Sequence, residues 1–197
     1  MVDSRMKLIA ITPESFIDNE VAYITMILDN GFDYVHIRKP KSTITEVRLL
    51  IKSIPQEYHK RLKLHGFYEL TKEFDIAGIH LNKQYPAPIS DNCRLKLSKS
   101  CHTLEELNDA SNYEYVFLSP IFDSISKVGY KSHFNLSEIS NNFRHSNVVA
   151  LGGMNASHLN EIKHSSFYGA AFLGYLFSAE TMIQLETRLN EINKNIK

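Results

Sequence analysis

The chain has 197 residues, of which 43% are hydrophobic and 22% charged, so it is long enough for one globular domain with a full core. Its 22 basic and 22 acidic side chains balance, which argues against nucleic acid or an anionic membrane as a partner and favours a small-molecule ligand. We find no signal peptide and no apolar run of the ~18 residues that span a bilayer, so a cytoplasmic location is expected.

Short runs with β propensity alternate along the chain with segments of helical spacing. After an N-terminal extension over residues 1–6, strands are predicted at 7–11, 34–37, 62–64, 78–81, 95–98, 115–118, 148–151 and 169–173. Apolar residues at helical spacing predict helices around 21–28, 47–54, 104–107 and 159–162, a short one near Leu136, and a last one over 182–192.

This alternation predicts a single (β/α)8 barrel, the TIM-barrel fold, over residues 7–197. Successive strands are spaced by roughly 25 residues, which is the size of one βα unit. A doubly wound open sheet is the alternative, but no Gly-x-Gly-x-x-Gly motif follows the first strand.

The loops that follow the strands carry the function of such a barrel, and a phosphate site is predicted after the last two strands. The seventh strand runs into Gly152 and Gly153, and Asn155 then caps a helix whose positive end points to the same place. Gly174 and Tyr175 follow the eighth strand. A plain turn is the alternative for the glycine pair.

Polar side chains follow other strands at the same predicted edge. Arg38 is placed inside the mouth, where an arginine needs an anionic partner or, alternatively, a structural ion pair. A connection of about 17 residues follows the sixth strand, and loops of this length often cover a ligand.

The remaining candidates receive simpler assignments. His80 is expected to make a structural hydrogen bond, and Cys93 and Cys101 to be free buried thiols without metal-ligand spacing. Surface positions are expected for two lysines and five histidines: Lys39, Lys41, His59, His133, His145, His158 and His164.

Several segments together resemble the thiamine phosphate synthase and TenI superfamily. They are LIAIT at 8–12, HIR at 36–38, GIHL at 78–81, SCHTLEE at 100–106, SPIF at 119–122 and ALGGM at 150–154. The resemblance spans nearly the whole chain. It implies either a synthase, which joins a pyrimidine pyrophosphate to a thiazole phosphate with Mg²⁺, or a TenI-like tautomerase, which aromatises a thiazole carboxylate phosphate without metal.

Departures from the synthase pattern favour the tautomerase. The Asn-Asp pair of the synthases corresponds to His65 and Gly66, their second metal-binding aspartate to Tyr85, and their glutamine after strand two to His36. Mg²⁺ prefers carboxylate ligands, so the resemblance implies no cofactor, with Mg²⁺ needed only by a synthase. Ser124, Ser126 and Lys127 instead match the pyrophosphate loop of the synthases, and are expected to bind substrate.

The resemblance assigns His102 as the general base that moves a proton on the thiazole ring. The sequence Thr103-Leu104-Glu105-Glu106 predicts a capping box, and the helix dipole then disfavours the imidazolium form of His102. His36, His65, Ser100 and Arg38 are expected to bind the substrate. A thiazole phosphate is thus the expected partner, with a homo-oligomer possible. A synthase and a non-catalytic phosphate-binding barrel stay as alternatives.

Overall fold

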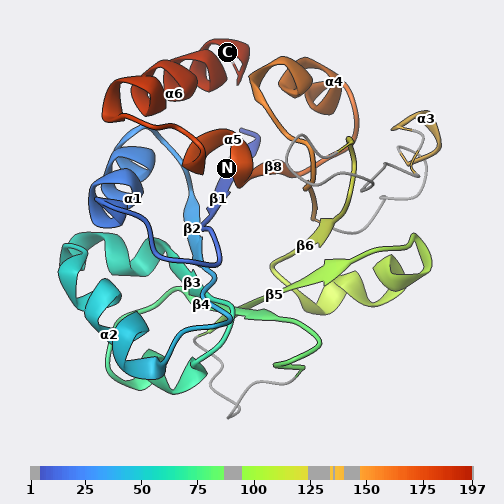
Figure 1. Ribbon diagram of the computed structural model, residues 1–197. Helices are drawn as coiled ribbons and strands as arrows, with labels where there is room; N and C mark the ends of the chain where they lie inside the picture. Colours follow the sequence, from blue (N-terminus) through green and yellow to red (C-terminus); the bar gives the residue numbers. More distant parts are fainter. Residues whose placement is uncertain (1–4, 87–94, 124–133, 135, 140–146, 197) are drawn as a thin grey trace.

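Eight parallel strands form a closed barrel, as the sequence predicts (Figure 1). The computed structural model describes residues 5–86, 95–123, 134, 136–139 and 147–196. In chain order the strands are β1 Lys7–Ile11, β2 Tyr34–Ile37, β3 Leu62–Leu64, β4 Gly78–Leu81, β5 Lys96–Cys101, β6 Tyr115–Leu118, β7 Val148–Ala150 and β8 Gly169–Phe172. Each pairs with the next, and β8 pairs with β1 to close the ring.

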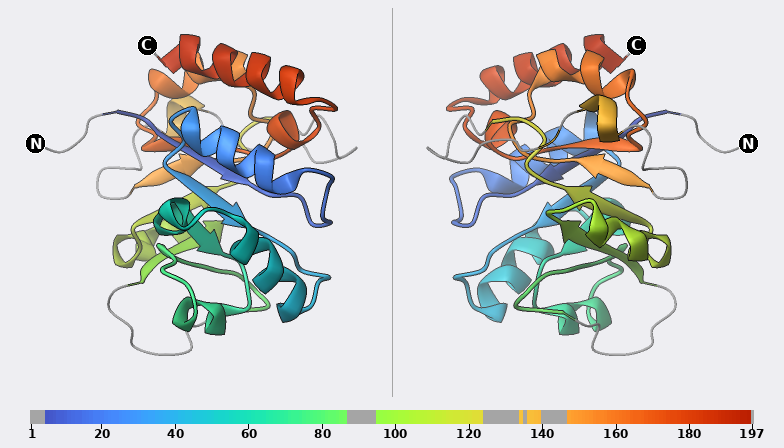
Figure 2. Two further views of the ribbon diagram at one scale, coloured as in Figure 1. Left: turned by 90° about the vertical axis from the view of Figure 1, so that its left-hand side faces the viewer. Right: turned by 90° about the vertical axis from the view of Figure 1, so that its right-hand side faces the viewer.

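The helices surround the barrel, and apolar residues on their inner faces pack against the outer faces of the strands. They are α1 Glu20–Asp29, α2 Ile44–Ser53, α3 Leu136–Ile139, α4 Leu159–Lys163, α5 Gly174–Phe177 and α6 Met182–Ile196, with 3₁₀ helices η1 Gln56–Arg61, η2 Tyr68–Lys72, η3 Glu105–Asn112 and η4 Ala156–His158. In the side views of Figure 2, α6 lies along the outside of the barrel near α1 and α4. None of the helices that the structure describes has the length and apolar character of a membrane span.

Two predicted elements differ in the structure. The helix expected around 104–107 is the 3₁₀ helix η3, in which the buried Leu107 and Ala110 are spaced three residues apart, a spacing that suits 3.0 residues per turn. Strand β5 runs on to Cys101, past the predicted end at 98, because Lys99, Ser100 and Cys101 continue the pairing with β6. Polar side chains in this part of β5 concealed the strand.

The barrel interior is divided into an apolar and a polar half. Ile9, Ile11, Phe117, Val149 and Ala171 form an apolar cluster on β1, β6, β7 and β8. The opposite side of the barrel carries buried polar residues on β2 to β5, namely His36, Lys63, His80 and Ser98. Because barrel interiors are usually filled by branched apolar side chains, the polar half sets β2 to β5 apart from the other strands.

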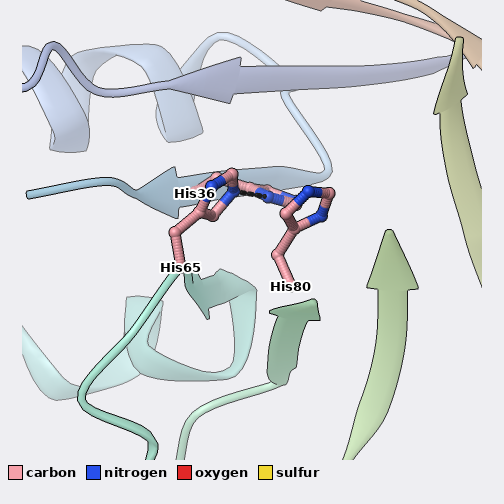
Figure 3. Close-up of side chains that lie close together, drawn as sticks. All are labelled: His36, His65 and His80. Atoms are coloured by element: carbon pink, nitrogen blue, oxygen red, sulfur yellow. Dashed lines mark hydrogen bonds between the residues drawn. The ribbon is translucent and has the colours of Figure 1, made fainter. Parts of the chain in front are cut away.

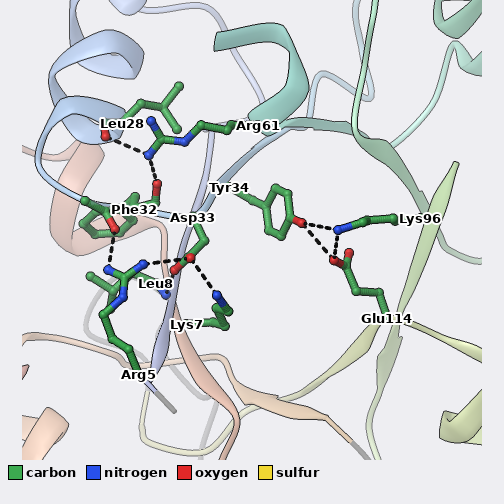
Figure 4. Close-up of polar contacts among 11 residues, drawn as sticks. Arg5, Lys7, Leu8, Leu28, Phe32, Asp33, Tyr34, Arg61, Lys96 and Glu114 are labelled. Carbon is green, nitrogen blue, oxygen red and sulfur yellow. Dashed lines mark hydrogen bonds and ion pairs between the residues drawn. The ribbon is translucent and has the colours of Figure 1, made fainter. Parts of the chain in front are cut away.

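Charged groups close the amino-terminal end of the polar half (Figure 4). The Glu114 carboxylate accepts hydrogen bonds from Lys63 Nζ at 2.6 Å and from the Tyr34 hydroxyl at 2.8 Å, and it pairs with Lys96 Nζ at 2.9 Å. Burial lowers the pKa of Lys63 to about 8, while the adjacent Glu114 opposes this effect. Asp33 lies nearby and accepts from the backbone N–H of Leu8, which ties the start of β2 to β1.

Lys39 and His59, which were expected at the surface, are buried instead. Lys39 Nζ donates to the carbonyl oxygens of Pro13 and Ser15 at 2.9 and 2.8 Å and pairs with Glu20 at 2.6 Å. It therefore anchors the loop after β1, which the sequence pattern could not show. His59 Nε2 donates to main-chain carbonyls at the end of α2.

The other predictions of surface positions and free thiols are confirmed in part. Lys41 and His164 are exposed and Cys101 is a buried free thiol, as predicted. His158 is only partly exposed, because its ring stacks on Phe122 with 3.8 Å between centroids. Three predicted residues, Cys93, His133 and His145, lie outside the described residues.

Candidate active site

A cavity of about 1030 Å³ opens at the carboxyl ends of the strands. Residues that follow most of the strands line it, among them Arg38, His65, Asn82, Ser100, His102, Gly152 and Gly174. This is the end at which TIM barrels place their active sites, and the volume suits a small organic ligand. The structure therefore brings together most of the site residues predicted from the sequence. Ser124, Ser126 and Lys127 lie outside the residues that the structure describes.

Glycine is required at the loop after β7. Gly152 and Gly153 both adopt positive φ, at 95° and 64°. A Cβ atom at Gly152 would lie 2.8 Å from Cα of Pro120, and one at Gly153 would lie 2.4 Å from the carbonyl oxygen of Asp123. The glycine pair thus allows the loops after β6 and β7 to pack closely at the rim of the cavity.

Four backbone N–H groups at this rim are available to an anion. No described residue accepts a hydrogen bond from the N–H of Gly152, Gly153, Gly174 or Tyr175. Asn155 caps the following helical segment, since its side chain accepts from the N–H groups of two residues in the first turn. Unpaired N–H groups beside a ligand cavity suit a phosphate. The phosphate assignment of these residues stays a prediction.

Arg188 lies beside Tyr175 and was not predicted from the sequence. Its Nη1 donates to Ser178 Oγ at 3.0 Å, and its guanidinium lies 5.5 Å from the centre of the Tyr175 ring. It also lines the cavity. Arg188 lies on α6, whose apolar residues predict an ordinary helix packed on the barrel. Its place next to that apolar stripe was the only sequence feature that could have indicated a role in the site.

Arg38 fits both roles considered for it, a residue that faces a ligand anion and a partner in a structural ion pair. It lines the cavity, and its Nη1 also pairs with Glu14 at 2.8 Å, with both side chains partly exposed. Such a pair adds little stability, so the guanidinium can bind a ligand anion at low cost.

Replacing Arg38 by alanine is therefore expected to weaken binding of a thiazole phosphate by ~1.5–3 kcal/mol, the loss typical of a charged hydrogen bond. Titration calorimetry measures the effect. Arg48→Ala is the matched control, because Arg48 also pairs with a carboxylate, Glu73, but does not line the cavity. Equal affinities of the two variants would make Arg38 a purely structural residue.

Three histidines from β2, β4 and the end of β3 meet below the cavity (Figure 3). His36 Nδ1 lies 2.7 Å from His65 Nε2, and His36 Nε2 lies 2.6 Å from the Tyr115 phenol oxygen. His80 bonds Ser98 and Ser100 through its two nitrogens, both at 3.0 Å, which confirms its predicted hydrogen-bonding role.

All three imidazoles are held neutral. Burial lowers the pKa of His36 and His65 far below the ordinary value and that of His80 to about 3. The positive charge of Lys63 acts in the same direction on each of them. Neutral imidazoles can donate one hydrogen bond and accept another, or can ligate a metal.

The geometry suits hydrogen bonding better than metal binding. The ligating nitrogens of His36, His65 and His80 lie within 4.8 Å of one another. However, the rings of His65 and His80 are stacked at 4.1 Å with only 15° between their planes, so their in-plane lone pairs do not converge on one ion. Both nitrogens of His36 and of His80 already have hydrogen-bond partners.

His102 lies at the cavity with one ring nitrogen hydrogen-bonded. Its ring lines the cavity, and its Nδ1 lies 3.1 Å from the carbonyl oxygen of Ser119. Because a carbonyl only accepts, Nδ1 must carry a proton, and in the neutral imidazole Nε2 is then the nitrogen with the lone pair.

The predicted capping box next to His102 differs in detail. Glu106 accepts from the N–H of His102 at 2.6 Å instead of the N–H of Thr103. The Thr103 hydroxyl still accepts from the Glu106 N–H, at 3.4 Å. The carboxylate therefore secures the backbone of His102 itself, and the helix that follows is the 3₁₀ helix η3.

The positions expected to bind Mg²⁺ in a synthase do not fit that ion here. A Cβ atom at Gly66 would lie 2.8 Å from the Tyr85 ring, so the ring occupies the space that a side chain at 66 would need. Neither residue offers a carboxylate, which Mg²⁺ sites in proteins usually supply. Lys83 and Lys99 also line the cavity and were not predicted; Lys99 lies in the part of β5 beyond its expected end.

The chain matches one protein family and resembles known proteins in sequence and fold. The family model described as thiamine monophosphate synthase matches residues 8–175. The crystal structure of a thiamine phosphate pyrophosphorylase from Bacteroides thetaiotaomicron is 32% identical, with a TM-score of 0.84 over 96% of this chain and 97% of that one. The thiamine-phosphate synthase of Flavobacterium psychrophilum is 24% identical over 94% of this chain and 98% of its own, and that of Methanococcus maripaludis 22% over 96% of each.

Proposed function

Since the chain belongs to the thiamine monophosphate synthase family, we propose that it is an enzyme of thiamine biosynthesis that binds a thiazole phosphate in its cavity. The observation that supports this ligand is the set of N–H groups of Gly152, Gly153, Gly174 and Tyr175, from which no described residue accepts a hydrogen bond, with Arg188 lining the same cavity. The phosphate would sit on these groups and leave the ring facing the histidines.

Condensation of a pyrimidine pyrophosphate with the thiazole phosphate is the first reaction that we propose. The sequence departures favoured the tautomerase over the synthase. We reverse this preference because these relatives carry the names thiamine-phosphate synthase or pyrophosphorylase. Arg38, Lys83, Lys99 and Arg188 line the cavity and supply positive charge for two phosphorylated substrates. These side chains, and not a protein-bound Mg²⁺, would stabilise the leaving pyrophosphate.

Tautomerisation of a thiazole carboxylate phosphate is the second candidate. None of these relatives is named for it, but the packing of Tyr85 against Gly66 favours a reaction without metal. His102 would take a proton from one ring atom at Nε2 and return it to another, so no proton is gained or lost.

Product analysis separates the two reactions. The purified chain is incubated with the thiazole carboxylate phosphate tautomer, with and without the pyrimidine pyrophosphate, in Mg²⁺ or in EDTA. A condensing enzyme releases pyrophosphate only when the pyrimidine is present, and because the thiazole substrate carries a ring carboxylate, it must also release CO₂ to form thiamine phosphate.

A tautomerase forms the aromatic thiazole without the pyrimidine, and its rate is expected to be unchanged in EDTA, since Gly66 and Tyr85 provide no carboxylate for a metal. Condensation that disappears in EDTA and returns with Mg²⁺ would contradict the role given to the cationic side chains. Saturable binding without either product would identify a non-catalytic phosphate-binding barrel.

A further inference from the structure

A line of hydrogen bonds runs from inside the barrel to the cavity. It begins at the Tyr115 phenol, which is 1% exposed and lies 2.6 Å from the fully buried His36. It continues from His36 to His65 at 2.7 Å (Figure 3). Tyr115 and His36 do not line the cavity, whereas His65 does. His65 is therefore the only member of this line that a ligand can reach.

The hydrogen bonds along this line have a preferred direction of donation. A phenol is a stronger acid than a neutral imidazole N–H, and an imidazole nitrogen is a better acceptor than a phenol oxygen. Burial raises the pKa of Tyr115 well above its ordinary value, so the phenol keeps its proton. The Tyr115 hydroxyl thus donates to Nε2 of His36.

The tautomers of both histidines follow from that first bond. With Nε2 accepting, the neutral His36 carries its proton on Nδ1 and donates to Nε2 of His65. His65 must then carry its own proton on Nδ1. No described residue accepts a hydrogen bond from this nitrogen, although the ring lines the cavity.

We infer that His65 is a ligand-binding residue whose Nδ1–H donates to an anionic oxygen of the bound substrate, and that His36 and Tyr115 are positioning residues that fix its tautomer. This inference rests on the proposed function. His65 stays neutral and acts as a donor, in the way that a neutral imidazole can polarise an oxygen.

His65 and His102 therefore have opposite tasks in one cavity. The Ser119 carbonyl leaves His102 with a lone pair on Nε2, and Tyr115 leaves His65 with a donor on Nδ1. A base that removes a proton and a donor that stabilises the resulting negative charge are the pair that a proton shift requires. The stacked ring of His80, itself held between Ser98 and Ser100, keeps His65 in place.

Nitrogen-15 NMR of the histidine rings tests the tautomers without any enzymatic reaction. We expect both His36 and His65 to be neutral and protonated on Nδ1 in the wild-type chain. In Tyr115→Phe, His65 should lose its single tautomer. Tyr34→Phe is the matched control, because Tyr34 lies next to Tyr115 in the barrel but bonds Glu114. A wild-type His65 protonated on Nε2 would overturn the inference.

Kinetics test the role of the donor. Tyr115→Phe is expected to lower kcat/KM by about tenfold or more, because His65 loses the single tautomer that donates to the substrate. His65→Asn should keep most of the activity, since its amide N–H₂ can replace Nδ1–H, whereas His65→Leu should not. Full activity of His65→Leu would refute the inference even with the function confirmed. Absence of both proposed reactions would refute the function, while the tautomers would still be decided by NMR.

Discussion

Between pH 6.5 and about pH 5, the free energy of unfolding is expected to fall by up to about 4 kcal/mol per pH unit. The cause is the cluster of the buried His36 and His80 with the partly buried His65, whose pKa values desolvation lowers in the folded chain. Below pH 6.5 the unfolded chain binds protons that the folded chain does not. Stability is therefore complete above this pH and is lost as the pH falls, by about 1.4 kcal/mol per unit for each histidine.

Urea unfolding followed by circular dichroism at several pH values measures this slope. His80→Gln should reduce it by about one third, because one of the three sites no longer titrates. His164→Gln is the matched control, since His164 is exposed and its removal should leave the slope unchanged. A flat stability profile in the wild-type chain above pH 5 would show that the buried histidines accept protons without unfolding.

Replacing His102 by alanine is expected to lower the rate of tautomerisation by ~10²–10⁴-fold, the usual contribution of a positioned general base. The fold and the affinity for a thiazole phosphate should change little, because among the described residues the ring bonds only the Ser119 carbonyl. Steady-state kinetics and calorimetric titration measure the two quantities.

His102→Gln provides the control for this base. An amide can replace the hydrogen bond to Ser119 but cannot take a proton from the substrate, so the rate should stay low. The partly exposed His158 follows β7 and does not line the cavity, so His158→Gln should keep the wild-type rate. A His102→Ala enzyme with more than about a tenth of the wild-type rate would assign the base elsewhere.

The fold was predictable because most strands can be identified from a short stretch of sequence. The strands Tyr115–Leu118 and Val148–Ala150 are short apolar runs with β propensity, which local sequence patterns identify. Strand β5 was misplaced because Lys99 and Ser100 look like loop residues. Their place in a strand depends on the polar interior of the barrel, which no local pattern reveals.

The site was predictable where residues follow strands and hidden where they meet across the barrel. Arg38, His65 and Gly152 could be placed at the mouth from strand ends alone. The contact of Tyr115 with His36 joins residues 79 positions apart in the chain, and hydrophobic periodicity contains no information about it. Arg188 was missed for a similar reason, since it reaches the cavity from the last helix.

The divided interior of the barrel has a consequence for how such an enzyme changes over time. Ile9, Phe117 and Val149 pack tightly, and substitutions there cost packing energy. The polar side chains on the other side instead form hydrogen bonds whose partners can be exchanged by single substitutions. Evolution, or a mutant library confined to β2 to β5, can therefore alter the reaction while the apolar strands preserve the scaffold.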